Sequence, residues 1–190
     1  MRTAKEESRN KFLVAAIEEM QTSGISGLSI RRVAERCGVS SGAPYKHFKN
    51  KSELLLESRR FIGRQWGEIQ FRVIADCCDN PREKLVEISC AYVRFLCENP
   101  AYQSVLMLSD NTLSPEQLAE KAKISALTER IIDEYCRSVE MSDSDRIRKT
   151  YAVRSFIFGA AFMINSGFFP NSEDSIGLAR ECIEREFDID

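Results

Sequence analysis

The side chains with the clearest chemistry lie close together in residues 40–52, which read SSGAPYKHFKNKS. Tyr45, Lys46 and His47 are consecutive, and Lys51 follows shortly after them. Each can donate a hydrogen bond and the lysines add positive charge, so together they could hold an anion such as phosphate. A Gly and a Pro come directly before the cluster, which would ordinarily indicate a loop.

The charge of the chain is unevenly distributed. Residues 1–65 contain 13 Lys and Arg against 7 Asp and Glu, a formal +6, while residues 66–190 contain 14 against 22, a formal −8. A basic N-terminal third on an acidic body favours an anionic partner at one end of the chain. A chance imbalance between two solvated surfaces would give the same counts, so charge alone leaves both interpretations open.

The composition is that of an ordinary globular protein, with 43% hydrophobic and 29% charged residues in a chain of 190. The chain has a single histidine, and it lacks the HExxH, GxSxG and Gly-rich phosphate-loop motifs and any metal-ligand cluster. These features argue against an enzyme. We therefore expect no catalytic residues, no metal and no cofactor.

The seven cysteines form no C-x-x-C pair and follow no secretory signal, so we expect reduced thiols in a cytoplasmic protein. Cys77 and Cys78 are adjacent and could be redox-sensitive, but reactivity also needs a lowered pKa and exposure. The apolar stretch 151–169 approaches the length of a membrane span. It contains Arg154 and Asn165, which favours a buried helix and no membrane partner.

Helical periodicity runs through most of the chain, and no stretch alternates convincingly with period two. The sequence thus predicts an all-α protein of about nine helices, at residues 5–22, 29–37, 42–48, 50–75, 81–98, 101–109, 114–138, 143–167 and 173–186.

Capping residues support the short helices of the N-terminal third. Ser29 and Asn50 are good N-caps, and Glu53 completes a capping box with Asn50. If Ser41 caps the third helix, Pro44 falls at its third position, where its missing N–H has no intrahelical partner. A very short helix is therefore permitted at residues 42–48.

Residues 29–48 fit a helix-turn-helix, in which a tight turn at Gly38 lets the second helix lie in the major groove of DNA. The first turn of such a helix faces the bases, and its flanks meet phosphates. Ser41 and Ala43 are small enough for close approach to bases, and Lys46 is a candidate for a guanine contact. Arg31 could hold a phosphate or could simply belong to a solvated face.

Residues 38–54, GVSSGAPYKHFKNKSEL, match the run GVSxGxxYxHFxxKxxL. The stretch resembles the DNA-binding domain of TetR-family transcriptional regulators over about residues 10–60. At the position after Lys51, often acidic in the family, this chain has Ser52. The resemblance implies that Tyr45, His47 and Lys51 meet the phosphate backbone. The complete set of predicted DNA-binding residues is Arg31, Ser41, Gly42, Ala43, Tyr45, Lys46, His47 and Lys51.

The resemblance also implies a division into a DNA-binding domain at residues 1–60 and an effector-binding and dimerisation domain at residues 61–190. Such a protein would be a repressor that binds a palindromic operator in double-stranded DNA as a homodimer and is released by a small-molecule effector. The alternative is a DNA-binding protein of the same fold that is controlled by a protein partner or organises DNA.

Two features of the acidic body bear on this expectation. Gly159, Ala160 and Ala161 would let a partner helix approach helix 143–167, although an ordinary buried central helix would look the same. Large apolar and aromatic residues could line an effector pocket or be plain core. They are Trp66, Tyr92, Phe95, Tyr102, Met107, Phe156 and Phe162.

Overall fold

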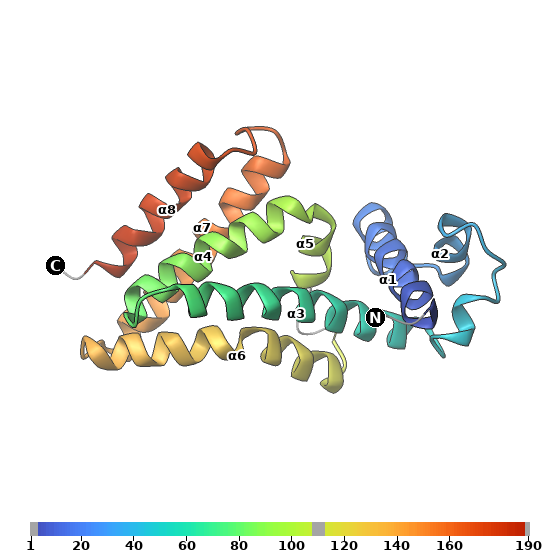
Figure 1. Cartoon of the computed structure of the whole chain (residues 1–190), viewed down its shortest axis with the longest axis horizontal. Helices are drawn as coiled ribbons and strands as arrows, with labels where there is room; N and C mark the ends of the chain where they lie inside the picture. The colour runs from blue at the N-terminus through green and yellow to red at the C-terminus, as the bar shows by residue number, and fades with distance from the viewer. Residues whose placement is uncertain (1–3, 108–112, 189–190) are drawn as a thin grey trace. The chain divides into compact units, whose positions relative to one another are not determined.

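The computed structural model describes residues 4–107 and 113–188, which form eight α-helices and one 3₁₀ turn, without a strand (Figure 1). The predicted all-α fold is confirmed. The elements are α1 (Ala4–Ser23), α2 (Ile30–Arg36), η1 (Pro44–Lys46), α3 (Lys51–Asp76), α4 (Pro81–Glu98), α5 (Pro100–Leu106), α6 (Pro115–Ser138), α7 (Asp143–Asn165) and α8 (Glu173–Phe187).

The helix starts follow local capping signals. The Ser29 side chain accepts a hydrogen bond from the backbone N–H of Arg32, as expected of an N-cap. Asn50 accepts from the backbone N–H of Glu53 at 2.9 Å. The Glu53 carboxylate in turn accepts from the backbone N–H of Lys49 at 2.5 Å, one residue earlier than in a standard capping box.

The prediction of a helix at residues 42–48 is wrong, because the chain forms only the 3₁₀ turn η1 there. Ala43, and not Ser41, is the N-cap, and it makes no side-chain hydrogen bond. The carbonyl of Pro44 accepts from the N–H groups of both His47 and Phe48, at 2.9 Å each. A run this short makes too few hydrogen bonds to offset the cost of starting an α-helix.

The chain divides into two compact units. Unit 1 comprises Met1–Gln65 and Pro100–Ile124, and unit 2 comprises Trp66–Asn99 and Ser125–Asp190. The chain passes from one unit to the other three times: within α3, between α4 and α5, and within α6. Helices α3 and α6 therefore each contribute to both units.

Unit 1 is built around α1, which packs against α2 and α5. The buried face of α1 carries Phe12, Leu13, Ala16, Ile17 and Met20, all at most 3% exposed. Gly24 and Gly38 follow α1 and α2 with φ angles of +67° and +68°, a conformation that glycine adopts readily at helix ends.

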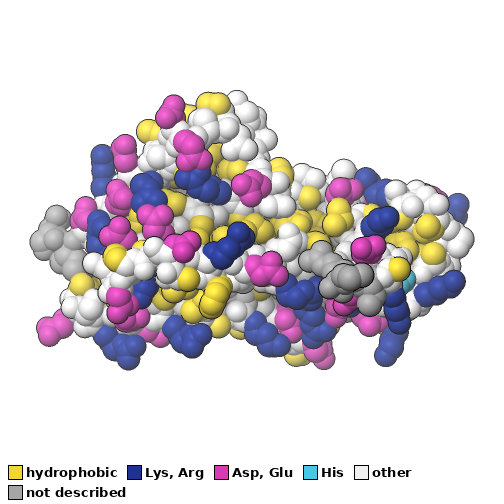
Figure 2. Space-filling view, in the orientation of Figure 1, with side chains coloured by type: hydrophobic (Ala, Val, Ile, Leu, Met, Phe, Trp, Pro, Cys, Tyr) yellow, Lys and Arg dark blue, Asp and Glu magenta, His cyan; other side chains and the backbone are white. Residues whose placement is uncertain are grey.

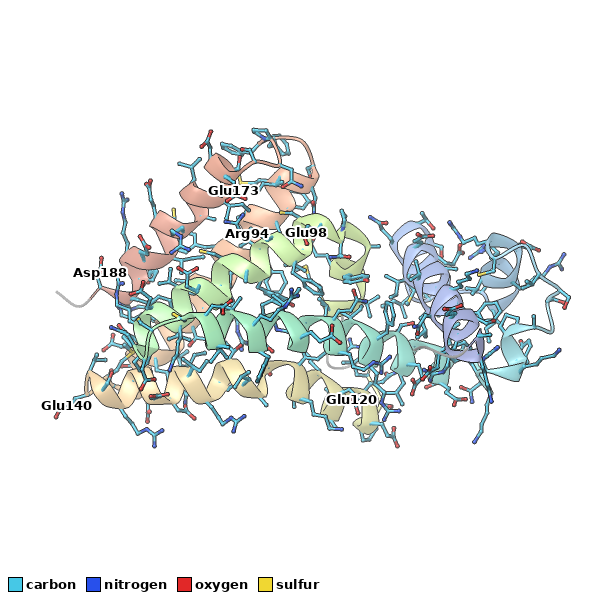
Figure 3. The ribbon with its side chains drawn as sticks, in the orientation of Figure 1. Arg94, Glu98, Glu120, Glu140, Glu173 and Asp188 are labelled. Carbon is cyan, nitrogen blue, oxygen red and sulfur yellow. The ribbon has the colours of Figure 1, made fainter. Side chains whose placement is uncertain are left out.

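In unit 2, helices α4, α7 and α8 pack against one another (Figure 1). The Arg94 guanidinium on α4 pairs with Glu173 in the first turn of α8 (Figure 3). The Tyr135 hydroxyl donates to the carbonyl of Phe187 at 2.6 Å. Among the described residues no helix is both long and apolar enough to cross a membrane.

Helix α7 differs from the buried helix expected of its sequence. Val153, Ile157, Ala161 and Ile164 are its only buried positions, and they form one face. Phe162 is 58% exposed on the remainder of its circumference. Within the chain, α7 is therefore covered on one side only.

Candidate nucleic-acid interface

The helix-turn-helix of unit 1 stands on a small buried core. Val33 and Ala34 of α2 are fully buried, as is Phe48 directly after η1. The turn between them is closed by a backbone hydrogen bond of 3.1 Å from Val39 to the carbonyl of Ala34. The Val39 hydrogen bond and the buried Phe48 side chain thus anchor the two ends of the segment from residue 39 to 47.

The residues predicted to read bases, Ser41, Ala43 and Lys46, and the predicted DNA-binding residue Gly42 lie in this segment. Ser41, Gly42 and Lys46 are exposed, and Ala43 is half-buried. A Cβ atom added to Gly42 would meet nothing within 4 Å. Packing within the chain therefore does not require a glycine there, whereas the close approach of a partner would. In Figure 2 the surface of this N-terminal part carries several Lys and Arg side chains.

Tyr45 and His47, two predicted phosphate contacts, differ in their surroundings. Tyr45 is 57% exposed. His47 is half-buried, with its ring centroid 5.4 Å from that of Phe12 and 6.2 Å from that of Phe48.

The protonation of His47 follows from that environment. Burial, and then the positive charges of Lys5, Arg9 and Lys46, lower the pKa of the imidazole below its ordinary value. Its Nδ1 is buried and has no hydrogen-bond partner within the described part of the chain. A neutral imidazole donates through one nitrogen only, so Nε2 is the atom that can donate to a phosphate.

Lys51 and Arg31 already have partners in the structure. The Lys51 ammonium donates to the carbonyl of Ser26 at 2.7 Å, which ties the loop before α2 to the start of α3. Two further N–H donors remain on that group for a phosphate. Arg31 is paired with Glu35 at 3.0 Å, and both side chains are more than half exposed. Such a surface pair is weak enough to exchange for a phosphate.

A buried carboxylate that the sequence analysis missed positions α2. Glu19 on α1 is 3% exposed, and its oxygens accept from the guanidinium groups of Arg32 and Arg36, the latter at 2.9 Å. Burial alone would raise the pKa of Glu19, but hydrogen bonds from Arg36 and Arg32 hold it below its ordinary value. The available signal was a charged residue on the apolar face of α1, next to Met20.

Three of the predicted effector-pocket residues gather in unit 2. The Trp66 ring centroid lies 4.6 Å from that of Tyr92 and 5.5 Å from that of Phe95, and Phe158 of α7 lies 6.2 Å from Tyr92. Trp66 and Phe95 are at most 3% exposed, and burial raises the pKa of Tyr92 to about 12. These residues form a packed aromatic cluster.

The other four predicted pocket residues do not join this cluster. Tyr102 lies in unit 1, where its hydroxyl accepts from the Gln65 side chain at 3.0 Å. Met107 is 58% exposed, and Phe156 and Phe162 lie at the surface of α7.

Unit 2 also carries two surface hollows. A groove of about 280 Å³ runs between α7 and α8 and is lined by apolar and small residues that include Gly159, Ala160, Met163 and Leu178. A second hollow of about 420 Å³ lies beside the start of α4, against Arg82 and Tyr135. Within residues 4–107 and 113–188 no cluster of His, Cys, Asp and Glu is arranged to hold a metal ion.

All seven cysteines are free thiols. Cys78 is exposed and Cys77 is half-buried. Burial, followed by the neighbouring Cys78, raises the pKa of Cys77, which disfavours the reactive thiolate.

Comparison with known proteins identifies the segment that carries this surface. Residues 12–58 match the family model of bacterial regulatory proteins, tetR family. The chain is 32% identical over 83 residues to the HTH-type transcriptional regulator AcrR of Shigella flexneri, covering 44% of this chain and 39% of that one. It is 47% identical over 47 residues to the tetracycline repressor protein class C of Escherichia coli, covering 25% and 22%. The chain thus spans less than half the length of these relatives.

Solved structures share the fold over almost the whole chain. A TetR family transcription regulator from Marinobacter aquaeolei VT8 superposes with a TM-score of 0.79 at 20% identity, covering 98% of each chain. A bacterial regulatory protein in the tetR family from Rhodococcus RHA1 superposes with a TM-score of 0.73 at 24% identity, covering 97% of this chain and 96% of that one. At these identities the likeness shows a shared fold, in agreement with the predicted all-α architecture.

Proposed function

We propose that this chain is a ligand-responsive transcriptional repressor of the TetR family that binds a palindromic operator as a homodimer. The match at residues 12–58 to bacterial regulatory proteins, tetR family, and the fold shared with solved structures support this proposal. The observation that carries this proposal is the exposed surface of the helix-turn-helix. Small and basic residues stand there on a buried core, and Gly42 faces open space.

Within that surface we assign two roles. Ser41, Ala43 and Lys46 read bases, because small residues permit close approach and a lysine donates to guanine acceptors in the major groove. Tyr45, His47 and Lys51 hold phosphates, and Arg31 joins them by exchanging Glu35 for the backbone. Phosphate contacts supply affinity and orientation but carry no sequence information.

The apolar surface of α7 and α8 supports homodimerisation. Phe162 and Met163 on α7 are 58% and 40% exposed, and Leu178 on α8 is 52% exposed beside the groove between the helices. Apolar side chains gathered in this way favour burial against a partner. A two-fold dimer would present two recognition segments to half-sites about 34–36 Å apart, one turn of DNA.

Effector control is the finer part of the proposal. An effector that binds one arrangement of the dimer better than another shifts the population away from the DNA-binding arrangement. We assign effector binding and dimerisation to residues 61–190 and DNA binding to residues 1–60. The single tryptophan, Trp66, lies in the aromatic cluster of unit 2, so its fluorescence is a convenient probe for effector binding.

The alternative is a DNA-binding protein of the same fold that responds to a protein partner. The exposed surface of α7 and α8 would then be occupied by that partner in place of a second copy. A metabolite screen for release from DNA distinguishes the two: a small molecule that releases the operator supports the first proposal, and release only by a protein supports the second.

The DNA-binding assignment is tested by the affinity of Tyr45→Ala and Lys51→Ala for the operator. We expect both variants to lose most of their binding and to keep the far-ultraviolet circular dichroism of the wild type. Unchanged affinity in both would overturn the assignment of the surface.

A further inference from the structure

A chain of ion pairs with alternating charges joins α1, α3 and α6 within unit 1. The Arg9 guanidinium on α1 donates to Oε2 of Glu57 on α3, and Arg60 donates through Nη1 to Oε1 of the same carboxylate at 2.7 Å. Arg60 also donates through Nη2 to Glu120 on α6 at 3.2 Å. The chain therefore joins three helices of one unit, with Glu120 at its α6 end (Figure 3).

Of the two carboxylates in this chain of ion pairs, Glu57 is buried and Glu120 is partly buried, and both are less exposed than the arginines. The side chains of Glu57 and Glu120 are 11% and 13% exposed, whereas those of Arg9 and Arg60 are 31% and 40% exposed. Burial would raise the pKa of Glu57, but hydrogen bonds from Arg60 and Arg9 hold it below its ordinary value. A buried anion depends on its cations, so each link constrains the next.

The other end of this chain of ion pairs, at Arg9, lies beside the His47–Phe48 segment, which we propose binds phosphate. The Arg9 guanidinium carbon lies over the Phe48 ring, 5.4 Å from its centroid. Phe48 follows His47 directly, and their rings are 6.2 Å apart. Arg9 is also one of the positive charges that act on the His47 imidazole.

We propose that this chain couples α6 to the His47–Phe48 segment, and that Glu57 and Arg60 are positioning residues for the DNA-facing surface. The proposal rests on the proposed function for its consequence, which is control of operator binding by the state of α6. Helix α6 continues from unit 1 into unit 2, so it is continuous with the part of the chain to which effector binding is assigned.

The coupling has a definite sign. When Glu120 no longer holds Arg60, the whole guanidinium of Arg60 is available to Glu57 and competes with Arg9 for its oxygens. Arg9 is then neutralised less completely, so its positive charge acts more strongly on His47 and the pKa of His47 falls. A less basic imidazole is protonated less readily beside a bound phosphate, so the contact of His47 with phosphate weakens.

The first test needs no DNA. Since His47 is the only histidine, its imidazole C2 proton gives one assignable NMR signal. We expect Glu120→Gln to lower the titration midpoint of that signal, and Glu120→Asp to restore it partly. The control for charge is Glu116→Gln, which removes the same charge from the same helix at a carboxylate bonded to Ser114 and not to an arginine. Lys123→Gln controls for the other partner of Glu120, which donates to its carboxylate at 2.9 Å, and should leave the midpoint unchanged. Equal midpoints in Glu120→Gln and the wild type would overturn the proposal.

A double-mutant cycle then separates the chain from a plain effect of charge. In the Arg9→Gln background, Glu120→Gln should leave the His47 signal unchanged, because the link it acts through is gone. If the changes in the His47 titration midpoint caused by Arg9→Gln and Glu120→Gln simply add in the double variant, the two residues act independently. That result would also overturn the proposal.

The second test measures operator affinity. We expect Glu120→Gln to weaken binding about threefold, a size typical of one partly exposed ion-pair link, and Glu116→Gln to leave it within error. The two proposals fail in different ways. A His47 response without any specific DNA binding would overturn the regulator assignment alone, whereas DNA binding equal in both variants would overturn the coupling alone.

Discussion

The helix-turn-helix surface and the surface of α7 and α8 are both exposed, but they are built from opposite kinds of side chain. On the first, Tyr45 and Lys46 stand on a buried core and offer hydrogen-bond donors and charge. On the second, Phe162 and Leu178 are more than half exposed and offer only apolar area. The difference indicates two different partners: a polyanion for the first surface and a second apolar surface for the other.

The two surfaces should also respond differently to salt. Binding that releases counterions from DNA weakens steeply with salt. Apolar association does not weaken in this way, and excluded salts such as sulfate strengthen it. Variants in the helix-turn-helix surface should therefore change the salt-dependent binding of DNA, and variants in the surface of α7 and α8 should change dimer formation.

The largest effect is expected from the apolar surface, through the loss of the dimer. The double variant Phe162→Glu with Leu178→Glu should be a monomer and should bind the operator at least about 100-fold more weakly, because the second half-site is no longer tethered. Sedimentation gives the mass, and a gel-shift titration gives the affinity.

The control for that variant is Phe71→Glu, which changes a 73% exposed phenylalanine on α3 of the same unit. It should remain dimeric. A dimeric mass for the α7–α8 variant would assign dimerisation to another surface.

The next effect concerns base reading. Lys46→Ala should cost about 1–3 kcal/mol per half-site and relax the preference at one base pair, because a donor to guanine is lost. The dimer mass should stay the same. Arg72→Ala, which removes a positive charge from an exposed residue of unit 2, serves as the control for charge alone. An equal loss in both variants would assign the effect of Lys46 to charge and not to base reading.

A smaller effect, on stability, is expected at Glu19, which holds the α2 arginines beneath the helix-turn-helix surface. Glu19→Gln should lower the free energy of unfolding by about 1–2 kcal/mol, because charged hydrogen bonds to two arginines are lost. Its exposed neighbour Glu18→Gln should be neutral. Thermal melts of both variants provide the measurement.

The pH dependence of the Glu19 contribution has a definite sign. The pKa of Glu19 lies below its ordinary value of 4.5, so the contribution is complete above that pH and is lost as pH falls through the native pKa. The wild type and Glu19→Gln should therefore converge in stability in acid. A difference that persists at low pH would contradict this assignment.

The smallest effect concerns His47. Its pKa is lowered by burial and by neighbouring cations, so the unfolded chain binds the proton more tightly than the native one, and native stability rises slightly with pH until it is complete above 6.5. A bound phosphate should raise that pKa. An NMR titration of the imidazole without and with operator DNA measures both shifts. An unchanged midpoint on DNA would place His47 away from phosphate.

The sequence predicted the helices well because their ends carry local signals. Ser29, Asn50 and Pro81 mark starts, and Gly24 and Gly38 mark ends, each through the backbone of its own neighbourhood. The exception was residues 42–48, where local signals permit a helix and only the hydrogen-bond geometry shows a 3₁₀ turn.

The ion pairs that support the candidate site could not be predicted in this way. Arg9 and Glu57 are 48 residues apart, and Arg36 and Glu19 are 17 apart, so no spacing rule joins them. The pocket prediction has the same weakness: aromatic residues on helical faces indicate burial, but not which of them meet. The structure brings Trp66 to Tyr92 and keeps Tyr102 in the other unit.

The central claim is that the exposed helix-turn-helix surface reads a palindromic operator as part of a dimer. Selection of bound fragments from a random DNA library, followed by affinity measurement over a range of salt concentrations, tests it most directly. The account predicts one enriched palindrome with half-site centres about 10 base pairs apart, bound with a steep salt dependence that Lys51→Ala reduces. Recovery of unrelated fragments, or of a site without two-fold symmetry, would contradict it.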